Sequence, residues 1–353
     1  MTELIDLRSD VCSIPTPAMR SAMASAEIGI DDYSEDLSIN RFEKRVAECL
    51  DKEAALFVQS GTMGNLVAVM THLEPDDTLL VSEHFHLYDH EGDAMRRVAR
   101  CRFRHVPDVT SGGLTRLLFE HCPDEMFLGD EAPKLLCLEN PVCRLGGTLL
   151  DLQHMQQLRS FADLRNMPIH LDGARLFNAA CALNVPPREI VAHVDSVMVD
   201  FVKAPAAPAG AVLLGSSDFI SRARRNRWML GGHWKQGGVL AACCEVALDT
   251  MIERIADDHA TARQLAEKLN GIAGLEVNLE RVVTNIVLLT VSEGSIDLER
   301  LTGEIESGGI RIGHFKEDRR CRLVTHKDVT QHAVSRVVRR VSDAVDRQLA
   351  GGQ

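Results

Sequence analysis

Two stretches of the chain decide the fold: His170-Leu171-Asp172-Gly173-Ala174-Arg175 and, farther along, Asp195-Ser196-Val197-Met198-Val199-Asp200-Phe201-Val202-Lys203. Each contains an apolar run that predicts a buried strand, and the two runs end near Asp172 and Lys203. A lysine amine can form a Schiff base, and a carboxylate can keep a pyridine nitrogen protonated so that the ring accepts electrons. The pair is therefore typical of a pyridoxal phosphate site. Taken alone, however, the same residues also fit a surface lysine and a capping aspartate.

Short apolar, β-branched runs alternate with helical patterns through roughly the first 245 residues. The alternation predicts an α/β fold with a mainly parallel sheet between helices. Ligands of such sheets bind beyond the carboxyl ends of the strands, so we expect Asp172 and Lys203 to face one pocket. The expected strands are Ala54–Val58, Thr78–Val81, Arg102–Val106, Lys134–Leu138, Pro168–Leu171, Ser196–Phe201 and Ala211–Leu214.

The pattern changes after residue 245, where Val239 to about Asn270 predicts one long helix. We therefore expect a large cofactor-binding domain over residues 1–245 and a smaller α+β domain over residues 246–353. The later expected elements are strands over Asn285–Val291, Ile310–His314 and Arg322–Thr325 and a final helix over Gln331–Leu349.

Composition narrows the class of protein. With 353 residues, 45% of them hydrophobic, the chain can bury a large core. A net charge of −12 without any run of Lys or Arg argues against nucleic-acid or membrane partners. The ten cysteines lack CxxC spacing, and neither a secretory signal nor an apolar stretch long enough to cross a bilayer is present. We therefore expect reduced thiols and a cytoplasmic location.

A glycine-containing turn opens a predicted helix in Phe57-Val58-Gln59-Ser60-Gly61-Thr62-Met63-Gly64-Asn65. Backbone N–H groups at a helix start bind phosphate oxygens, and glycine lets the anion approach closely. The spacing matches neither a P-loop nor a dinucleotide motif. Such a turn is more often only a turn, but its place ahead of Asp172 and Lys203 suits a cofactor phosphate.

Three histidines fall together in His84-Phe85-His86-Leu87-Tyr88-Asp89-His90. A zinc site needs about three protein ligands with supporting partners, and no partner cluster is evident, so we predict that no metal is bound here. An imidazole stacked on the cofactor ring is the better use of one of them. An ordinary half-buried histidine remains an alternative for His84 and His90.

The chain as a whole resembles the L-threonine aldolases of the β-eliminating lyase group, pyridoxal phosphate enzymes of the aspartate aminotransferase fold (fold type I). The likeness runs nearly end to end. The matching motifs are Asp6-Leu7-Arg8-Ser9-Asp10, Tyr33-Ser34-Glu35-Asp36, Glu53-Ala54-Ala55-Leu56-Phe57-Val58, Ser60-Gly61-Thr62-Met63-Gly64-Asn65, Leu138-Glu139-Asn140, His170-Leu171-Asp172-Gly173-Ala174-Arg175-Leu176-Phe177-Asn178 and Leu323-Val324-Thr325-His326.

The resemblance implies a cofactor site in which Lys203 forms the Schiff base and Asp172 pairs with the pyridine nitrogen. Gly61 and Thr62 would bind the phosphate. His86 matches the ring-stacking histidine, which is also a candidate for proton transfer at the substrate hydroxyl.

The resemblance also implies a substrate side. Ser9, Arg175 and Arg322 would hold the substrate carboxylate, and Arg175 would also border the cofactor. The forked guanidinium of arginine suits a carboxylate because it binds both oxygens. Lys235 stands where the family places a cation that reaches a neighbouring subunit's phosphate. An active homodimer with shared sites is therefore expected, and pairing of dimers into tetramers stays open.

Two segments depart from the family pattern. Glu-Asn-Thr-His-Asn is usual before the Gly-Gly pair, whereas here the segment is Glu139-Asn140-Pro141-Val142-Cys143, so that Val142 replaces a histidine beside the β-hydroxyl. Gly-Leu-Gly-Ala-Pro usually follows the lysine, whereas here Ala204-Pro205-Ala206-Ala207-Pro208 stiffens the loop. Two milder changes are Ser34 in place of the family's glycine and Lys235 in place of its arginine.

These observations lead us to expect retro-aldol cleavage of β-hydroxy-α-amino acids to glycine and an aldehyde, with a pocket made more apolar by Val142. A second hypothesis keeps the cofactor but changes the bond that breaks, giving racemisation, β-elimination or transamination of a small amino acid. A third is a cofactor-binding protein with little catalysis. The joint presence of Lys203, Asp172, Arg175 and Arg322 argues against the third.

Overall fold

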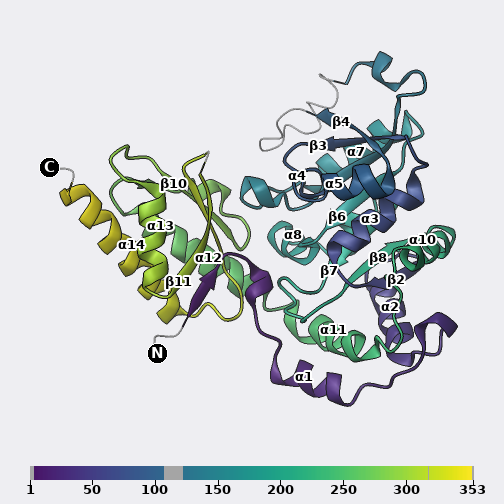
Figure 1. Ribbon diagram of the computed structural model, residues 1–353, viewed down its shortest axis with the longest axis horizontal. Coiled ribbons are helices and arrows are strands. Elements are labelled where there is room, and N and C mark those ends of the chain that lie inside the picture. Colours follow the sequence, from purple (N-terminus) through teal and green to yellow (C-terminus); the bar gives the residue numbers. More distant parts are fainter. Residues whose placement is uncertain (1–3, 107–121, 317, 352–353) are drawn as a thin grey trace. The chain divides into compact units, whose positions relative to one another are not determined.

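The computed structural model describes residues 4–106, 122–316 and 318–351, which divide into two compact units (Figure 1). Unit 1 comprises Met1–Ile14 with Glu253–Gln353, and unit 2 comprises Pro15–Ile252. The division expected from the sequence kept residues 1–14 in the large domain and fell at residue 246. The structure differs because strand β1 (Ile5–Leu7) pairs in parallel with β11 (Ile310–Phe315), which ties the N-terminal segment to unit 1.

Unit 2 contains a seven-stranded sheet in the order β2-β8-β7-β6-β5-β3-β4. Only β8 runs antiparallel to its neighbours, so the expected mainly parallel sheet is confirmed. All seven predicted strands are present, and their ends differ by no more than two residues from the prediction. Their bounds are β2 Ala54–Val58, β3 Thr78–Ser82, β4 Arg102–Val106, β5 Pro133–Glu139, β6 Ile169–Gly173, β7 Ser196–Asp200 and β8 Ala211–Gly215.

Helices cover both faces of this sheet. Leu56 and Val58 of β2 pack in one apolar cluster with residues of α3 and α10, whereas Phe57 between them contacts Phe42 of α2 edge-on, with ring centroids 5.6 Å apart. Because side chains alternate along a strand, these contacts place α2 on the opposite face from α3 and α10. Among the described residues of unit 2 the helices are α1 Pro17–Ala24, α2 Leu37–Cys49, α3 Gly61–His72, α4 His86–Asp89, α5 Gly92–Ala94, α7 Leu152–Asp163, α8 Leu176–Leu183, α9 Pro187–Val191, α10 Ser217–Met229 and α11 Gly238–Met251. Short helical turns lie between them at η2 Asp31–Tyr33, η3 Met95–Ala99, η4 Asp124–Phe127 and η5 Cys143–Leu145.

Unit 1 contains a five-stranded sheet in the order β1-β11-β12-β10-β9, packed against three helices (Figure 1). Its core joins Leu265, Val287 and Leu301 from α12, β10 and α13. The single helix predicted over residues 239–270 is wrong: α11 ends at Met251 and α12 begins at Ile255, with the boundary between the units in the break. The remaining elements are β9 Leu275–Glu276, β10 Ile286–Val291, β12 Arg320–Val324, α12 Ile255–Asn270, α13 Leu298–Ser307 and α14 Gln331–Gly351.

Candidate functional site

Three acidic residues end three neighbouring strands of the unit 2 sheet. Glu139 ends β5, Asp172 lies near the end of β6, and Asp200 ends β7. The strands are parallel, and Glu139 and Asp172 are paired in register, so the three carboxylates come from one edge of the sheet. All three side chains are buried, with Asp172 only 3% exposed. This is the edge at which ligands bind in open α/β sheets.

Lys203 follows β7 and lies beside the last of these carboxylates. Its Nζ is 3.2 Å from Oδ2 of Asp200, and its side chain is 18% exposed. The backbone turns back at once, because the N–H of Ala206 donates to the carbonyl of Lys203 over 2.9 Å. Ala206 adopts a left-handed conformation with φ of +63°. This is one of the two positions where the resemblance expects glycine, so the substitution leaves an alanine in a conformation that costs it about 1–2 kcal/mol.

Helix α3 begins directly against β7, at the turn predicted to bind phosphate. A Cβ on Gly61 would lie 3.0 Å from Cε of Met198 and 3.4 Å from Oδ2 of Asp200. A Cβ on Gly64 would lie 2.7 Å from Cγ of Met198, so both glycines let the helix approach the strand. The first backbone N–H groups of a helix have no acceptor within it, and those of Gly61 and Thr62 suit a phosphate.

His86 begins the short helix α4 and contacts two buried carboxylates. Its Nδ1 is 2.8 Å from Oε1 of Glu91, and its backbone N–H donates to Oε2 of Glu139 over 2.6 Å. Burial disfavours the charged ring, but the hydrogen bond to Glu91 and the charges of Asp172, Glu91 and Glu139 outweigh it and raise the pKa of His86. Burial and the charge of Asp172 raise the pKa of Glu139 to about 7. We call His86, Glu91 and Glu139 the His86 cluster.

A second set of polar side chains lies behind Asp172, between α3 and the sheet. Asn65 of α3 donates from Nδ2 to Oδ2 of Asp172 over 2.9 Å, and its Oδ1 is 3.1 Å from Nε2 of His170. The other ring nitrogen of His170 is 2.9 Å from Oγ of Ser196, which in turn is 2.8 Å from Nε2 of His72. We call Asn65, His170, Ser196 and His72 the His170 chain.

The metal hypothesis for the histidine segment takes a different form in the structure. Among the residues that the structure describes, one group could hold a metal ion: His86, Glu91 and Asp172, whose ligand atoms all lie within 4.8 Å of one another. His84 and His90 are not part of it. The nitrogen of His86 and the oxygen of Glu91 already contact each other, and Asn65 donates to Asp172, so the group is a hydrogen-bonded network as it stands.

Two further predicted residues, Arg175 and Lys235, belong to unit 2. Arg175 is buried and stands between β6 and α8, three residues after Asp172. Lys235 is exposed in the loop before α11 and forms an ion pair with Asp32, which lowers the pKa of that carboxyl. Ser34, one of the milder departures, has φ of +59°, another left-handed position where the resemblance expects glycine.

Ser9 and Arg322 belong to unit 1, where they are held by a network of their own. Arg322 Nη2 donates to the carbonyl of Arg8, the residue before Ser9, over 3.3 Å. The hydroxyl of Ser9 caps the turn that follows it, accepting from the N–H of Val11. The structure thus brings the segments of both predicted residues together within this unit.

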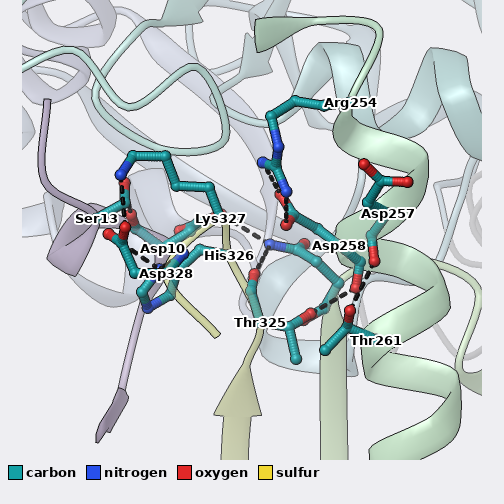
Figure 2. A network of polar contacts seen from close by, with 11 residues as sticks. Asp10, Ser13, Arg254, Asp257, Asp258, Thr261, Thr325, His326, Lys327 and Asp328 are labelled. Atoms are coloured by element: carbon teal, nitrogen blue, oxygen red, sulfur yellow. Dashed lines mark hydrogen bonds and ion pairs between the residues drawn. The ribbon is translucent and has the colours of Figure 1, made fainter. Parts of the chain in front are cut away.

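Figure 2 shows the buried groups that fix these segments. The carboxylate of Asp10 accepts from Nδ2 of Asn285 over 3.1 Å, and the same amide donates to the carbonyl of Thr325. Nε2 of His326 lies 2.8 Å from the carbonyl of Asp6. Arg254 pairs with both oxygens of Asp258. Two of the motifs that carry the resemblance, residues 6–10 and 323–326, are therefore hydrogen-bonded to each other.

Val142 lies in the loop after β5, and its side chain is only 1% exposed. Its N–H donates to the carbonyl of Thr148 over 2.8 Å. The loop is tied to the His86 cluster, since Oε1 of Glu139 accepts from the N–H of Cys143 over 2.8 Å. An imidazole at position 142 would have to be accommodated in this buried loop.

Sequence reasoning missed three polar residues that the structure places at the site. Asn65 lay inside a quoted motif without a role, Glu91 follows His86 by five positions, and Asp200 interrupts an otherwise apolar strand. The acidic residue inside the apolar run was the available signal for Asp200. Glu91 carried no signal of its own, because its contact with His86 depends on the turn between α4 and α5.

The chain is similar to known proteins over nearly its whole length. Residues 6–293 match the family described as β-eliminating lyase. The chain is 36% identical to low-specificity L-threonine aldolase 1 of Arabidopsis thaliana over 92% of each chain. It is 32% identical to the low specificity L-threonine aldolase of Escherichia coli K12, covering 95% of this chain and 97% of the relative. The solved structure of Leishmania major threonine aldolase superposes with a TM-score of 0.77 at 18% identity, covering 98% of this chain and 99% of that one.

Proposed function

Because this chain belongs to the β-eliminating lyase family, we propose that it cleaves β-hydroxy-α-amino acids of the threonine class to glycine and an aldehyde. The chain is a pyridoxal phosphate-dependent lyase. The proposal concerns the substrate on which it acts. The observation that carries the proposal is the meeting of Lys203, the Gly61 turn and the carboxylates of Asp172 and Asp200 at one edge of the sheet.

The residues at this edge fit the groups of pyridoxal phosphate. When bound, the cofactor supplies an electron-accepting ring that stabilises negative charge at the substrate Cα. Lys203 offers the amine that attaches it, and the N–H groups of Gly61 and Thr62 offer donors to its phosphate. Asp172 retains acceptor capacity beside its contacts with Asn65 and the N–H of Ala174, and it can hold the proton of a pyridine nitrogen.

His86 is the residue we assign to proton transfer at the β-hydroxyl. Its Nδ1 is held by Glu91, which fixes the orientation of the ring, and the side chain is 40% exposed. The hydrogen bond to Glu91 and the neighbouring carboxylates raise the pKa of His86, which makes the ring a stronger base for the hydroxyl proton. Val142 offers no proton-transfer group, so His86 or a bound water would have to do this work.

Substrate orientation is assigned to Arg175, Ser9 and Arg322. A carboxylate held by a guanidinium fork is fixed in two directions, which determines the bond at Cα that lies across the ring plane. Retro-aldol cleavage needs the Cα–Cβ bond in that position. Arg322 is prepared for this role by its contact with the carbonyl of Arg8, which limits the rotation of its side chain.

A second candidate function is another pyridoxal phosphate reaction of a small amino acid: racemisation, β-elimination or transamination. The observation in its favour is Val142, since a buried apolar residue stands where the aldolases place an imidazole near the β-hydroxyl. The same electron acceptor serves all of these reactions, and the bond placed across the ring selects among them.

We also propose a cytoplasmic homo-oligomer, at least a dimer, whose sites are shared between subunits. Tyr33, Trp228 and Met229 are 74%, 62% and 64% exposed, and large exposed apolar groups mark surfaces that other protein covers. Lys235 belongs to the same part of the chain and would reach the partner's phosphate. No helix among the described residues is long and apolar enough to cross a membrane.

The test is release of aldehyde and glycine when the purified, cofactor-loaded protein is given L-threonine, L-allo-threonine and L-phenylserine in turn. Release from any one of them, lost in Lys203→Ala, supports the aldolase. Spectral change on adding amino acid without any aldehyde would reject it in favour of the second candidate. Unchanged turnover in Lys203→Ala would reject both.

A further inference from the structure

We propose that Asn65 is a positioning residue for the cofactor. His170, Ser196 and His72 hold the side chain of Asn65 so that its amide N–H groups point at Asp172 and Glu91. The inference rests on the proposed role of Asp172 within the function above. It concerns four residues other than the lysine and the residues of the proposed phosphate turn. Each of them is linked to the next by a side-chain hydrogen bond.

The position of Asn65 between two carboxylates is the first observation. Its Nδ2 is 2.9 Å from Oδ2 of Asp172 and 3.3 Å from Oε2 of Glu91. Asn65 itself is fully buried, and both carboxylates are nearly so. Buried carboxylates need donors, and a single amide serves both of these. The amide therefore also connects Asp172 to the His86 cluster, since Glu91 contacts Nδ1 of His86.

The order of protons along the chain follows from the neutral state of its histidines. Burial lowers the pKa of His170 to about 3 and that of His72 to about 4, so neither ring is charged near neutral pH. A neutral imidazole carries one N–H. Because Oδ1 of Asn65 can only accept, Nε2 of His170 must donate to it.

The remaining bonds are then determined. Nδ1 of His170 has no proton and accepts from the hydroxyl of Ser196, which has thereby used its only hydrogen. Ser196 must in turn accept from Nε2–H of His72. Every group of the His170 chain thus has a single direction of donation, and all of them lead toward Asp172.

The chain prevents the amide of Asn65 from turning over. In the reversed orientation Oδ1 would face the carboxylates of Asp172 and Glu91, two acceptors for which it has no proton. Such unsatisfied buried groups are costly. Packing holds the helix that carries Asn65 close to the sheet, because a Cβ on the adjacent Gly64 would lie only 2.7 Å from Cγ of Met198 on β7.

The consequence concerns the proton on the pyridine nitrogen. A carboxylate that accepts a hydrogen bond from Asn65 is favoured in its ionised form, and an ionised Asp172 holds that proton. Without the donor, or with the amide reversed, the carboxylate is a stronger base, and the shared proton moves from the ring nitrogen toward Asp172. A ring that loses its positive charge repels a second proton less, so the pH at which the visible absorption of the bound cofactor changes should move upward.

The experiment uses cofactor-loaded full-length protein and two variants. Asn65→Asp keeps the shape but removes the donor, and we expect about tenfold weaker cofactor binding and an upward move of the absorption midpoint by about one pH unit. Ser196→Ala breaks the His170 chain at a hydrogen bond that does not involve Asp172. We expect cofactor binding to weaken about fivefold and the absorption midpoint to move upward. Cofactor affinity and the pH midpoint are measured by visible absorption, and thermal stability is measured alongside.

The matched control is Thr71→Val, which removes a hydroxyl from the same helix. Thr71 is buried and bonds to the carbonyl of Val67 and to Asn226, outside the His170 chain. It should leave affinity and midpoint unchanged. If Asn65→Asp does not fold, Ser196→Ala decides alone. The proposal is overturned if the variants lose stability but keep the wild-type midpoint and cofactor affinity. It is also overturned if Thr71→Val changes the midpoint and the affinity as they do. Absence of aldehyde release rejects only the aldolase, since the cofactor readouts do not depend on the substrate.

Discussion

The His86 cluster and the His170 chain meet at Asn65, yet they shift the pKa values of their histidines in opposite directions. His86 lies among Glu91, Glu139 and Asp172, whose negative charges raise its pKa despite burial. His170 faces an amide and a hydroxyl, and burial lowers its pKa to about 3. The residue type is the same on both sides. What differs is how deeply the ring is buried and whether its partners carry charge.

The His86 cluster and the His170 chain have different roles around Asp172. The His86 cluster can change protonation near neutral pH, which a group that transfers protons requires. The His170 chain cannot, which suits a group whose only task is to hold the amide of Asn65 in one orientation. Both regions act on the carboxylate of Asp172. We assign the His86 cluster to the reaction itself and the His170 chain to support from the protein interior.

The largest expected effect breaks the His86 cluster at Glu91. Glu91→Ala removes the partner of Nδ1 of His86 and should lower kcat/KM about 100-fold, the upper range for loss of a supporting hydrogen bond. Removal of the negative charge also lowers the pKa of His86, so the limb of the pH–rate profile that reports this group should move to lower pH. Glu91→Gln should recover part of the rate. An unshifted profile with normal folding would show that Glu91 acts only on structure.

The next prediction concerns the pH dependence of folding stability, to which His170 and Glu139 should contribute with opposite signs. The pKa of His170 falls from 6.5 to about 3 on folding, so its contribution to stability is present above pH 6.5 and is lost as pH falls toward 3. The pKa of Glu139 rises from 4.5 to about 7, so its contribution is present below pH 4.5 and is lost as pH rises toward 7. Each slope is limited to about 1.4 kcal/mol per pH unit.

Urea unfolding of cofactor-free protein between pH 4.5 and 6.5 tests this opposition. We expect the stability difference between wild type and His170→Gln to grow with pH, and that between wild type and Glu139→Gln to shrink. Only the pH dependence counts, since each variant also loses stability that does not vary with pH. Slopes of equal sign would contradict the opposite pKa shifts of His170 and Glu139.

A smaller effect is expected in the loop after Lys203, which serves as a reference outside both regions. Ala206→Gly should stabilise the protein by about 1 kcal/mol, because glycine adopts the left-handed conformation without strain. The neighbouring Ala207→Gly should destabilise it by a similar or smaller amount, since glycine there only adds freedom to the unfolded chain. Both are measured by urea unfolding. A loss of stability in Ala206→Gly would show that the loop is not strained at this position.

The smallest effect is expected at Val142. Val142→His restores the imidazole of the aldolases, but the side chain is buried beside the His86 cluster, so we expect a gain of only about threefold in kcat/KM on L-threonine. Val142→Leu is the control for volume. A gain in both variants would assign the effect to packing and not to the imidazole.

Much of this arrangement was predictable from the sequence because it depends on local patterns. Apolar runs gave the strands of the unit 2 sheet, and Asp172 and Lys203 fell near strand ends that a parallel sheet brings to one edge. The helix expected over residues 239–270 failed because periodicity continues across a break that separates two units. The pairing of β1 with β11 carries no local signal at all.

By itself, then, the sequence determined the family, the α/β fold and the cofactor, since motif and hydrophobic period are properties of short segments. It also supplied the residues that we propose to hold this cofactor. Only the tertiary structure decided how these residues are charged and held. Glu91, Asn65 and His170 come from separate elements, and their protonation depends on burial and on partners across α3, β6 and the α4–α5 turn. Electrostatic environment is a property of the packed chain, so a histidine in the sequence does not reveal whether its pKa will be raised, as in His86, or lowered, as in His170.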